Sequence, residues 1–278
     1  IGNHERFPQK GGLEKMNSVK ETTGLQQQTR GGVRGGIFSS GALHVIAMLF
    51  MLLDHLWATF FPYLDFLTCI GRLAFPIFAF MIAEGFYHTR NLKRYIGKMF
   101  IFAVISEIPF DLIYGGTIFY PFHQNVLWTF LISLILMAGV ERVREKNQPI
   151  LTVLASAAAL LFGYGIGTVT MVDYYGAGVL TVLLFYFLRG KHPAVLLLQF
   201  AGMYFINAGL LSGFFYTVSI FGHAFEFPQQ AFALCALPII WLYSGERGCR
   251  KKWFQYFCYA FYPGHLLVLY IAWQALVR

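Results

Sequence analysis

The sequence predicts an all-α protein, a polytopic membrane helix bundle with about nine transmembrane helices. Three observations predict this class. Of the 278 residues, 57% are hydrophobic and only 12% are charged, whereas a soluble domain carries about 25% charged residues. Nine apolar windows approach the roughly 20 residues that a helix needs to cross a bilayer. Basic residues also recur in every second loop.

The nine windows follow one another without a polar linker, so one bundle is expected rather than two domains. The eighth window is short and contains Pro238, so a kink or a shifted boundary is expected there. In chain order the windows cover residues 42–61, 68–87, 95–113, 124–140, 150–168, 172–188, 193–212, 229–243 and 254–276.

The segment 1–40 is polar, rich in glycine and without apolar periodicity. This composition predicts a disordered tail, and the segment lacks the apolar core of a signal peptide. Because the sequence begins at Ile1, Met16 is a candidate natural start. Residues 41–278 are expected to form the transmembrane domain.

The placement of basic residues predicts the orientation of the bundle. All Lys and Arg residues except Arg72 and Arg278 lie in the N-terminal tail or in the loops after the second, fourth, sixth and eighth windows. The alternate loops, near 62–67, 114–123, 164–172 and 213–228, contain none. The positive-inside rule therefore predicts a cytoplasmic N-terminus and an external C-terminus. Basic residues spread over five segments do not form a nucleic-acid surface.

Ionisable residues inside the windows predict a polar chamber, because such residues usually face the bundle interior. Asp54 and His55 lie in the outer half of the first window, and Arg72 lies near the outer start of the second. The expected chamber also includes residues of other helices: Glu84, Glu107, Asp111, His123, Asn125, Asp173 and His265.

Simpler roles stay open for several of these residues. Arg72 is also a candidate interfacial anchor, and Asp111 and Asp173 are candidates for solvated loop positions. Glu84 lies close enough to the following basic loop to pair with Arg90 or Lys93.

The residue types favour proton transfer without a metal. The sequence has no HExxH motif, GxSxG elbow or P-loop, and its four cysteines form no CxxC pair. A neutral His55 can remove a proton from an amine or hydroxyl, and Arg or amide donors can stabilise an oxyanion. This combination fits acyl transfer, but a proton-coupled transporter would use the same residues.

Six motifs carry a resemblance to the TraX family, in the family's order from about Leu43 to the C-terminus. They are "VIAMLFMLLDHL", "IGRLAFPIFAFMIAEGFYHTRN", "KRYIGKMFIFAVISEIPFDL", "QNVLWTF", "VDYYGAGVL" and "YAFYPGHLLVLY". The resemblance implies a conjugation-associated acetylase of the bacterial inner membrane. It would transfer an acetyl group from acetyl-CoA to the N-terminus of a pilin-like peptide.

The resemblance extends in logic to acyltransferase family 3, in which an Arg or Lys precedes an essential His by eleven positions. Here the essential position is His55 and the basic one is occupied by His44. His55 is then implied as general base, oriented by Asp54 or another carboxylate. Arg72, Asn125 and His265 would line the chamber and stabilise charge.

Acetyl-CoA is expected to bind from the cytoplasm, where basic loops meet its phosphates. Membrane lipids are further expected partners, and the sequence sets no oligomeric state. The alternatives are O-acylation of a surface glycan or lipid, proton-coupled transport, and a non-catalytic role in pilus assembly. The residues implied for acetyl-CoA are His44, Arg90, Lys93, Arg94, Arg247 and Lys251.

Overall fold

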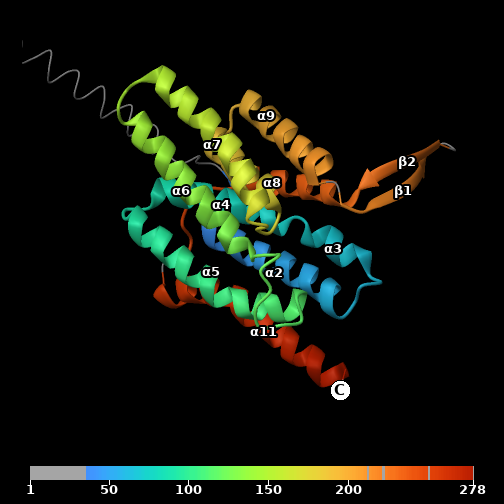
Figure 1. Cartoon of the computed structure of the whole chain (residues 1–278). Helices are drawn as coiled ribbons and strands as arrows, with labels where there is room; N and C mark the ends of the chain where they lie inside the picture. The colour runs from blue at the N-terminus through green and yellow to red at the C-terminus, as the bar shows by residue number, and fades with distance from the viewer. Residues whose placement is uncertain (1–35, 212, 221–222, 250, 278) are drawn as a thin grey trace, which may run out of the picture.

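The computed structural model describes residues 36–211, 213–220, 223–249 and 251–277. They form a helix bundle from which one short hairpin protrudes (Figure 1). The first helix described, α2, begins at Ser40. The predicted disordered tail falls mostly on residues 1–35, which lie outside the described residues.

Every apolar window coincides with one helix or with two consecutive helical segments. Among the described residues, five segments are long and apolar enough to cross a membrane: Ser40–Thr59, Asp65–His88, Val126–Arg144, Pro149–Val169 and Pro193–Leu211. The prediction of a helical membrane bundle is therefore confirmed, whereas the count of nine crossings and the orientation stay predictions. The α-helices are α2 (Ser40–Thr59), α3 (Asp65–Gly71), α4 (Ala74–His88), α5 (Leu92–Tyr114), α6 (Val126–Arg144), α7 (Pro149–Val169), α8 (Tyr175–Phe187), α9 (Pro193–Tyr204), α10 (Ala236–Trp241) and α11 (Lys252–Val277).

One described segment, a short β-hairpin, departs from the predicted all-helical fold. Strands β1 (Phe215–Ile220) and β2 (His223–Pro228) pair antiparallel, with Tyr216 opposite Phe227. Aromatic and β-branched residues dominate "FYTVSI", and these types favour strands. The hairpin joins two helical segments that the sequence separates by a loop without Lys or Arg.

Three windows contain breaks in regular α-helix. The second window is divided between α3 and α4 at Arg72 and Leu73. The seventh ends in a π-helix, η1 (Phe205–Leu211), and the eighth begins as a 3-10 helix, η2 (Gln229–Cys235), before α10. Such departures from α-helix often accompany functional sites, and here they border the cavity described below.

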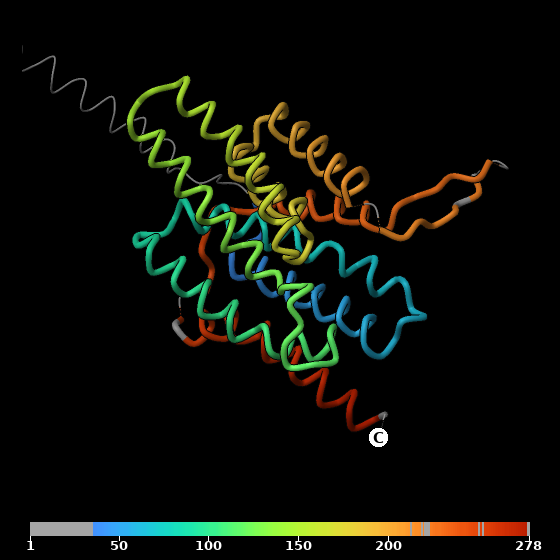
Figure 2. The backbone as a smooth tube through the Cα atoms, viewed as in Figure 1, coloured from blue at the N-terminus to red at the C-terminus, as the bar shows by residue number. Residues whose placement is uncertain are grey.

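Helix α4 lies inside the bundle, in contact with α2, α6, α8 and α10. Helix α11 packs against α2 and α5 on one side, whereas α7, α8 and α9 lie on the other (Figure 2). Gly176 allows α7 and α8 to approach closely, because a Cβ there would lie 2.1 Å from the Tyr164 carbonyl oxygen.

The loops define two ends of the bundle. The "hairpin end" comprises loops 60–64, 115–125 and 170–174 together with the hairpin. The "basic end" comprises loops 89–91, 145–148, 188–192 and 242–249. At the hairpin end, two backbone hydrogen bonds join loops 115–125 and 170–174: Gln124 donates to Met171 at 3.0 Å, and Asp173 donates to Gln124 at 2.8 Å.

Candidate functional site

Two cavities adjoin inside the bundle. The "small cavity", at the hairpin end, has a volume of about 330 Å³. The "large cavity", toward the basic end, has a volume of about 800 Å³. They have five lining residues in common, so they meet across one set of side chains: Met51, Phe78, Val126, Phe130 and Tyr262.

Helix α2 borders both cavities with one face. His44 and Met48 line the large cavity, Met51 lines both, and His55 and Ala58 line the small one. Their spacing of four, three, four and three residues keeps them on one side of a helix. The eleven residues from His44 to His55 correspond to about 16 Å along the axis.

Asp54 is held by Arg72 and by α3. Nη2 of Arg72 donates to both carboxylate oxygens, at 2.5 and 2.6 Å, and Thr68 Oγ1 donates to Oδ1 at 2.7 Å. Nη1 of Arg72 also donates to Gln230 Oε1 at 3.3 Å. Gly71 permits this approach, since a Cβ there would lie 2.4 Å from Asp54 Cβ.

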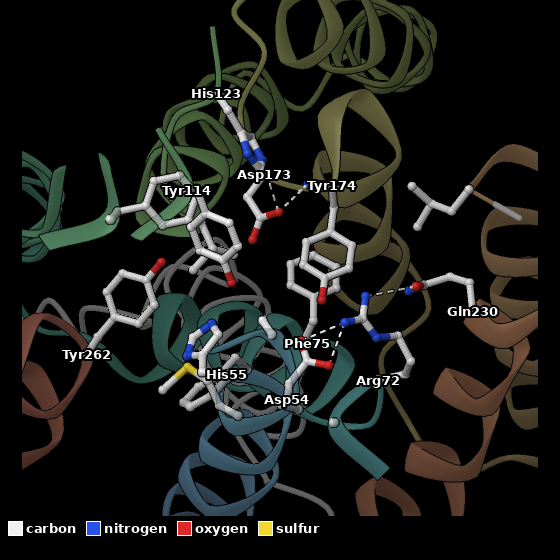
Figure 3. A pocket seen from close by; sticks show the side chains of 18 of the residues that line it. Asp54, His55, Arg72, Phe75, Tyr114, His123, Asp173, Tyr174, Gln230 and Tyr262 are labelled. Atoms are coloured by element: carbon white, nitrogen blue, oxygen red, sulfur yellow. Dashed lines mark hydrogen bonds and ion pairs between the residues drawn. The ribbon is translucent and has the colours of Figure 1, made fainter. Parts of the chain in front are cut away.

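His55 has a partner on a different helix. Its Nδ1 lies 2.6 Å from Nε2 of His265 on α11, and Nδ1 of His265 lies 2.7 Å from the Phe261 carbonyl oxygen. Both histidines are buried. Asp54 and His55, although adjacent, therefore have separate partners, and His265 rather than Asp54 is hydrogen-bonded to His55. Figure 3 shows His55 at one side of the small cavity and the Asp54–Arg72 pair at the other.

A second pair faces them from the loops of the hairpin end (Figure 3). His123 Nε2 lies 3.4 Å from Asp173 Oδ1. The hydrogen bond that His123 donates to the Asp173 carboxylate raises the pKa of His123, against the opposing effect of burial. The next residue, Tyr174, has a left-handed φ of 61° and stacks on Phe75 with ring centroids 4.0 Å apart. This turn directs the Asp173 and Tyr174 side chains into the cavity.

The structure brings five of the predicted catalytic and chamber residues together on the small cavity. They are Asp54, His55, Arg72, His123 and Asp173. His265 lies behind His55 and is outside this lining.

Three further predicted chamber residues stabilise the neighbouring loop instead. Asn125 caps α6 by accepting from Leu127 N at 3.0 Å, and it donates to the Ala103 carbonyl and to Glu107. Asp111 accepts from Tyr120 N at 2.9 Å. Neither Glu107, Asp111 nor Asn125 is among the described residues that line the small cavity.

The structure corrects both the predicted cavity and the predicted partner of Glu84. It lies in the last turns of α4, at the basic end, and lines the large cavity. It accepts from Arg189 Nε at 2.6 Å and lies 3.3 Å from His88 Nε2. The partner is therefore a residue of the loop after α8, which no spacing in the sequence relates to Glu84.

The large cavity collects most of the residues predicted to bind acetyl-CoA. His44, Arg90, Arg94 and Arg247 line it, together with Lys98. Among the described residues, Lys93 and Lys251 are outside this lining.

The aromatic lining of the small cavity was not predicted. Phe75, Tyr114, Tyr174 and Tyr262 gave no signal, because aromatic residues are 18% of the sequence. Gln230 is different, since a polar residue near the start of an apolar window could have marked it as a chamber residue.

Comparisons with known proteins agree on one family. The family model described as TraX protein matches residues 39–272. The probable fimbrial assembly protein FimC, serogroup H1, of Dichelobacter nodosus is 28% identical over 245 residues, which cover 84% of this chain and 94% of the relative. No solved structure matches the chain.

Proposed function

The chain belongs to the TraX family, and from this premise we propose that it is a multi-pass acetyltransferase of the bacterial inner membrane. It moves an acetyl group from cytoplasmic acetyl-CoA to the amine of a pilin-like or other small peptide. In this proposal nine helices cross the membrane, the basic end faces the cytoplasm, and the hairpin end faces outward. The distribution of Lys and Arg supports this orientation.

The observation that carries the proposal is the pair of adjoining cavities along α2. Transfer across a membrane needs a donor site and an acceptor site that meet at the reacting atoms. The large and small cavities meet at Met51, Phe78, Val126, Phe130 and Tyr262, one turn of α2 before His55.

The large cavity suits an acyl-CoA donor. Arginine and lysine bind phosphate oxygens through charge-assisted hydrogen bonds, and four Arg and Lys side chains of the described residues line this cavity. Among its other lining residues are apolar side chains such as Met48 and Met81, which suit the less polar arm of the donor. The basic residues are Arg90, Arg94, Lys98 and Arg247.

In the small cavity, His55 acts as general base. As the amine nitrogen bonds to the acyl carbon, His55 accepts the amine proton. It then returns that proton to the thiolate that leaves when the carbon–sulfur bond breaks. A positioned base of this type contributes about 10²–10⁴-fold to a rate.

The direct test is acetyl transfer by the purified protein in detergent, with labelled acetyl-CoA and a pilin-like peptide. His55→Ala is expected to remove transfer, whereas His223→Ala, in the exposed hairpin, is expected to retain it. Near-normal transfer by folded His55→Ala protein would refute the role of His55. Labelling of a peptide hydroxyl, a glycan or a lipid instead of an amine would support O-acylation.

The name of the Dichelobacter nodosus relative favours a second candidate, a non-catalytic factor in pilus assembly. An assembly factor, or a proton-coupled transporter, has no need of CoA. CoA at a hundred times its Kd stabilises a protein that binds it by about 2.7 kcal/mol. Thermal stabilisation by CoA, lost on Arg94→Glu/Arg247→Glu, therefore separates the acetyltransferase from both alternatives.

A further inference from the structure

We propose that His265 is a positioning residue that fixes the tautomer of His55. With the Phe261 carbonyl, it holds His55 in the form that carries hydrogen on Nδ1. Nε2 of His55 is then the free base that faces the small cavity. The catalytic meaning of this arrangement rests on the proposed function, but the tautomer itself does not.

The first step is the bond between His265 and Phe261. A backbone carbonyl oxygen only accepts hydrogen bonds, so Nδ1 of His265 carries the hydrogen in their 2.7 Å contact. A neutral imidazole has one N–H. Nε2 of His265 is therefore an acceptor.

The second step assigns His55. Its Nδ1 lies 2.6 Å from that acceptor and must donate. Nε2 of His55 is left with its lone pair, and it has no hydrogen-bond partner among the described residues. This assignment of donors and acceptors requires that His265 is neutral. A second proton would place a cation on a side chain that is only 8% exposed, with no carboxylate of the described residues in hydrogen-bond contact, which is costly.

The ring geometry agrees with a directional bond. The two imidazole planes lie 18° apart, with centroids separated by 4.8 Å. Nδ1 of His55 and Nε2 of His265 are closer to each other than two stacked ring faces, which lie about 3.5 Å apart. The two rings therefore meet edge to edge. On its other side, His265 stacks on the Phe261 ring at 4.9 Å and 13°. His265 is thus fixed by its own helix and in turn orients His55.

The charged groups of the small cavity are already paired. Asp54 accepts from Arg72, and Asp173 contacts His123. No carboxylate of the described residues is hydrogen-bonded to His55. In a Ser-His-Asp triad, the aspartate orients the histidine and selects its tautomer. Here a second imidazole and a backbone carbonyl have that role.

Nitrogen-15 NMR of ring-labelled histidines in the detergent-solubilised full chain tests the tautomer directly. Signals of His55 are identified by their loss in His55→Gln. We expect hydrogen on Nδ1 of His55 in the wild type and in His265→Gln, whose amide oxygen also accepts, but not in His265→Leu. A wild-type His55 with hydrogen on Nε2 would overturn the proposal, and so would an unchanged tautomer in His265→Leu.

Kinetics test the consequence. We expect His265→Leu to lower kcat by about 10²-fold with little change in KM for acetyl-CoA, and His265→Gln to recover most of kcat. If His265 had a purely structural role, both variants would lose kcat in proportion to a fall in their melting temperatures. Absence of transfer by the wild type would refute the proposed function and leave the NMR result decisive for the tautomer. An active wild type with an equally active His265→Leu would refute the positioning role alone.

Discussion

The Asp54–Arg72 pair offers the sharpest test of what holds the small cavity together. Removing one partner of a buried ion pair costs about 3–5 kcal/mol, because the other charge is left uncompensated. The two side chains retain 18% and 16% exposure at the cavity, so we expect the lower value, about 3 kcal/mol, for Asp54→Asn or Arg72→Met. For a chain of this size, this corresponds to a melting temperature lower by about 6–12 °C.

The double variant Asp54→Asn/Arg72→Met completes the cycle. Replacing both members of a buried pair with neutral groups is often close to neutral. The double variant is therefore expected to be no less stable than either single variant. The measurement is the fraction of detergent-solubilised protein that stays monodisperse on size exclusion after heating.

Asp65→Asn is the matched control, since it makes the same change on an exposed residue in the first turn of α3. Its cost is limited to the helix dipole, about 0.3–1 kcal/mol. The reasoning is refuted if Asp54→Asn costs no more than this control. It is also refuted if the losses of the two single variants simply add in the double variant.

Three further variants test other contacts with the same heating measurement. Gly176→Ala should lower stability by about 1–3 kcal/mol, since its Cβ would collide with the Tyr164 carbonyl, and an unchanged melting temperature would contradict this packing. The raised pKa of His123 means that its pair with Asp173 contributes fully to stability below about pH 6.5 and less as the pH rises through the folded-state pKa. In Asp173→Asn this decline of stability with rising pH should therefore be absent. A stability-against-pH profile identical to that of the wild type would exclude the contribution of the pair. Asn125→Ala should cost about 1–2 kcal/mol for the lost helix cap, and a loss below about 0.5 kcal/mol would contradict that role.

The helices were predictable because length and apolar composition are local properties. The window 68–87, for example, corresponds to Asp65–His88 in the structure. The hairpin was not predictable, since its strands are short and, within the described part of the chain, pair only with each other. The window pattern detects runs of apolar residues and gives no information on pairing between strands.

The site was predictable in part of its membership but not in its contacts. The cost of burying ionisable groups identified Asp54, His55 and Arg72 as interior residues. Their partners depend on how distant helices pack, and His55 and His265 are 210 positions apart. Glu84 illustrates the same limit, because its partner, Arg189, comes from another loop.

The spacing of His44 and His55 acquires a physical meaning from the cavities. Eleven residues turn a helix by about three full turns, so both side chains lie on one face although about 16 Å separates them. His44 meets the large cavity and His55 the small one. A spacing of nine or thirteen would direct one of them away from its cavity, because each residue turns the helix by about 100°. The spacing therefore matches the distance between the two cavities, and a single rigid helix sets their separation.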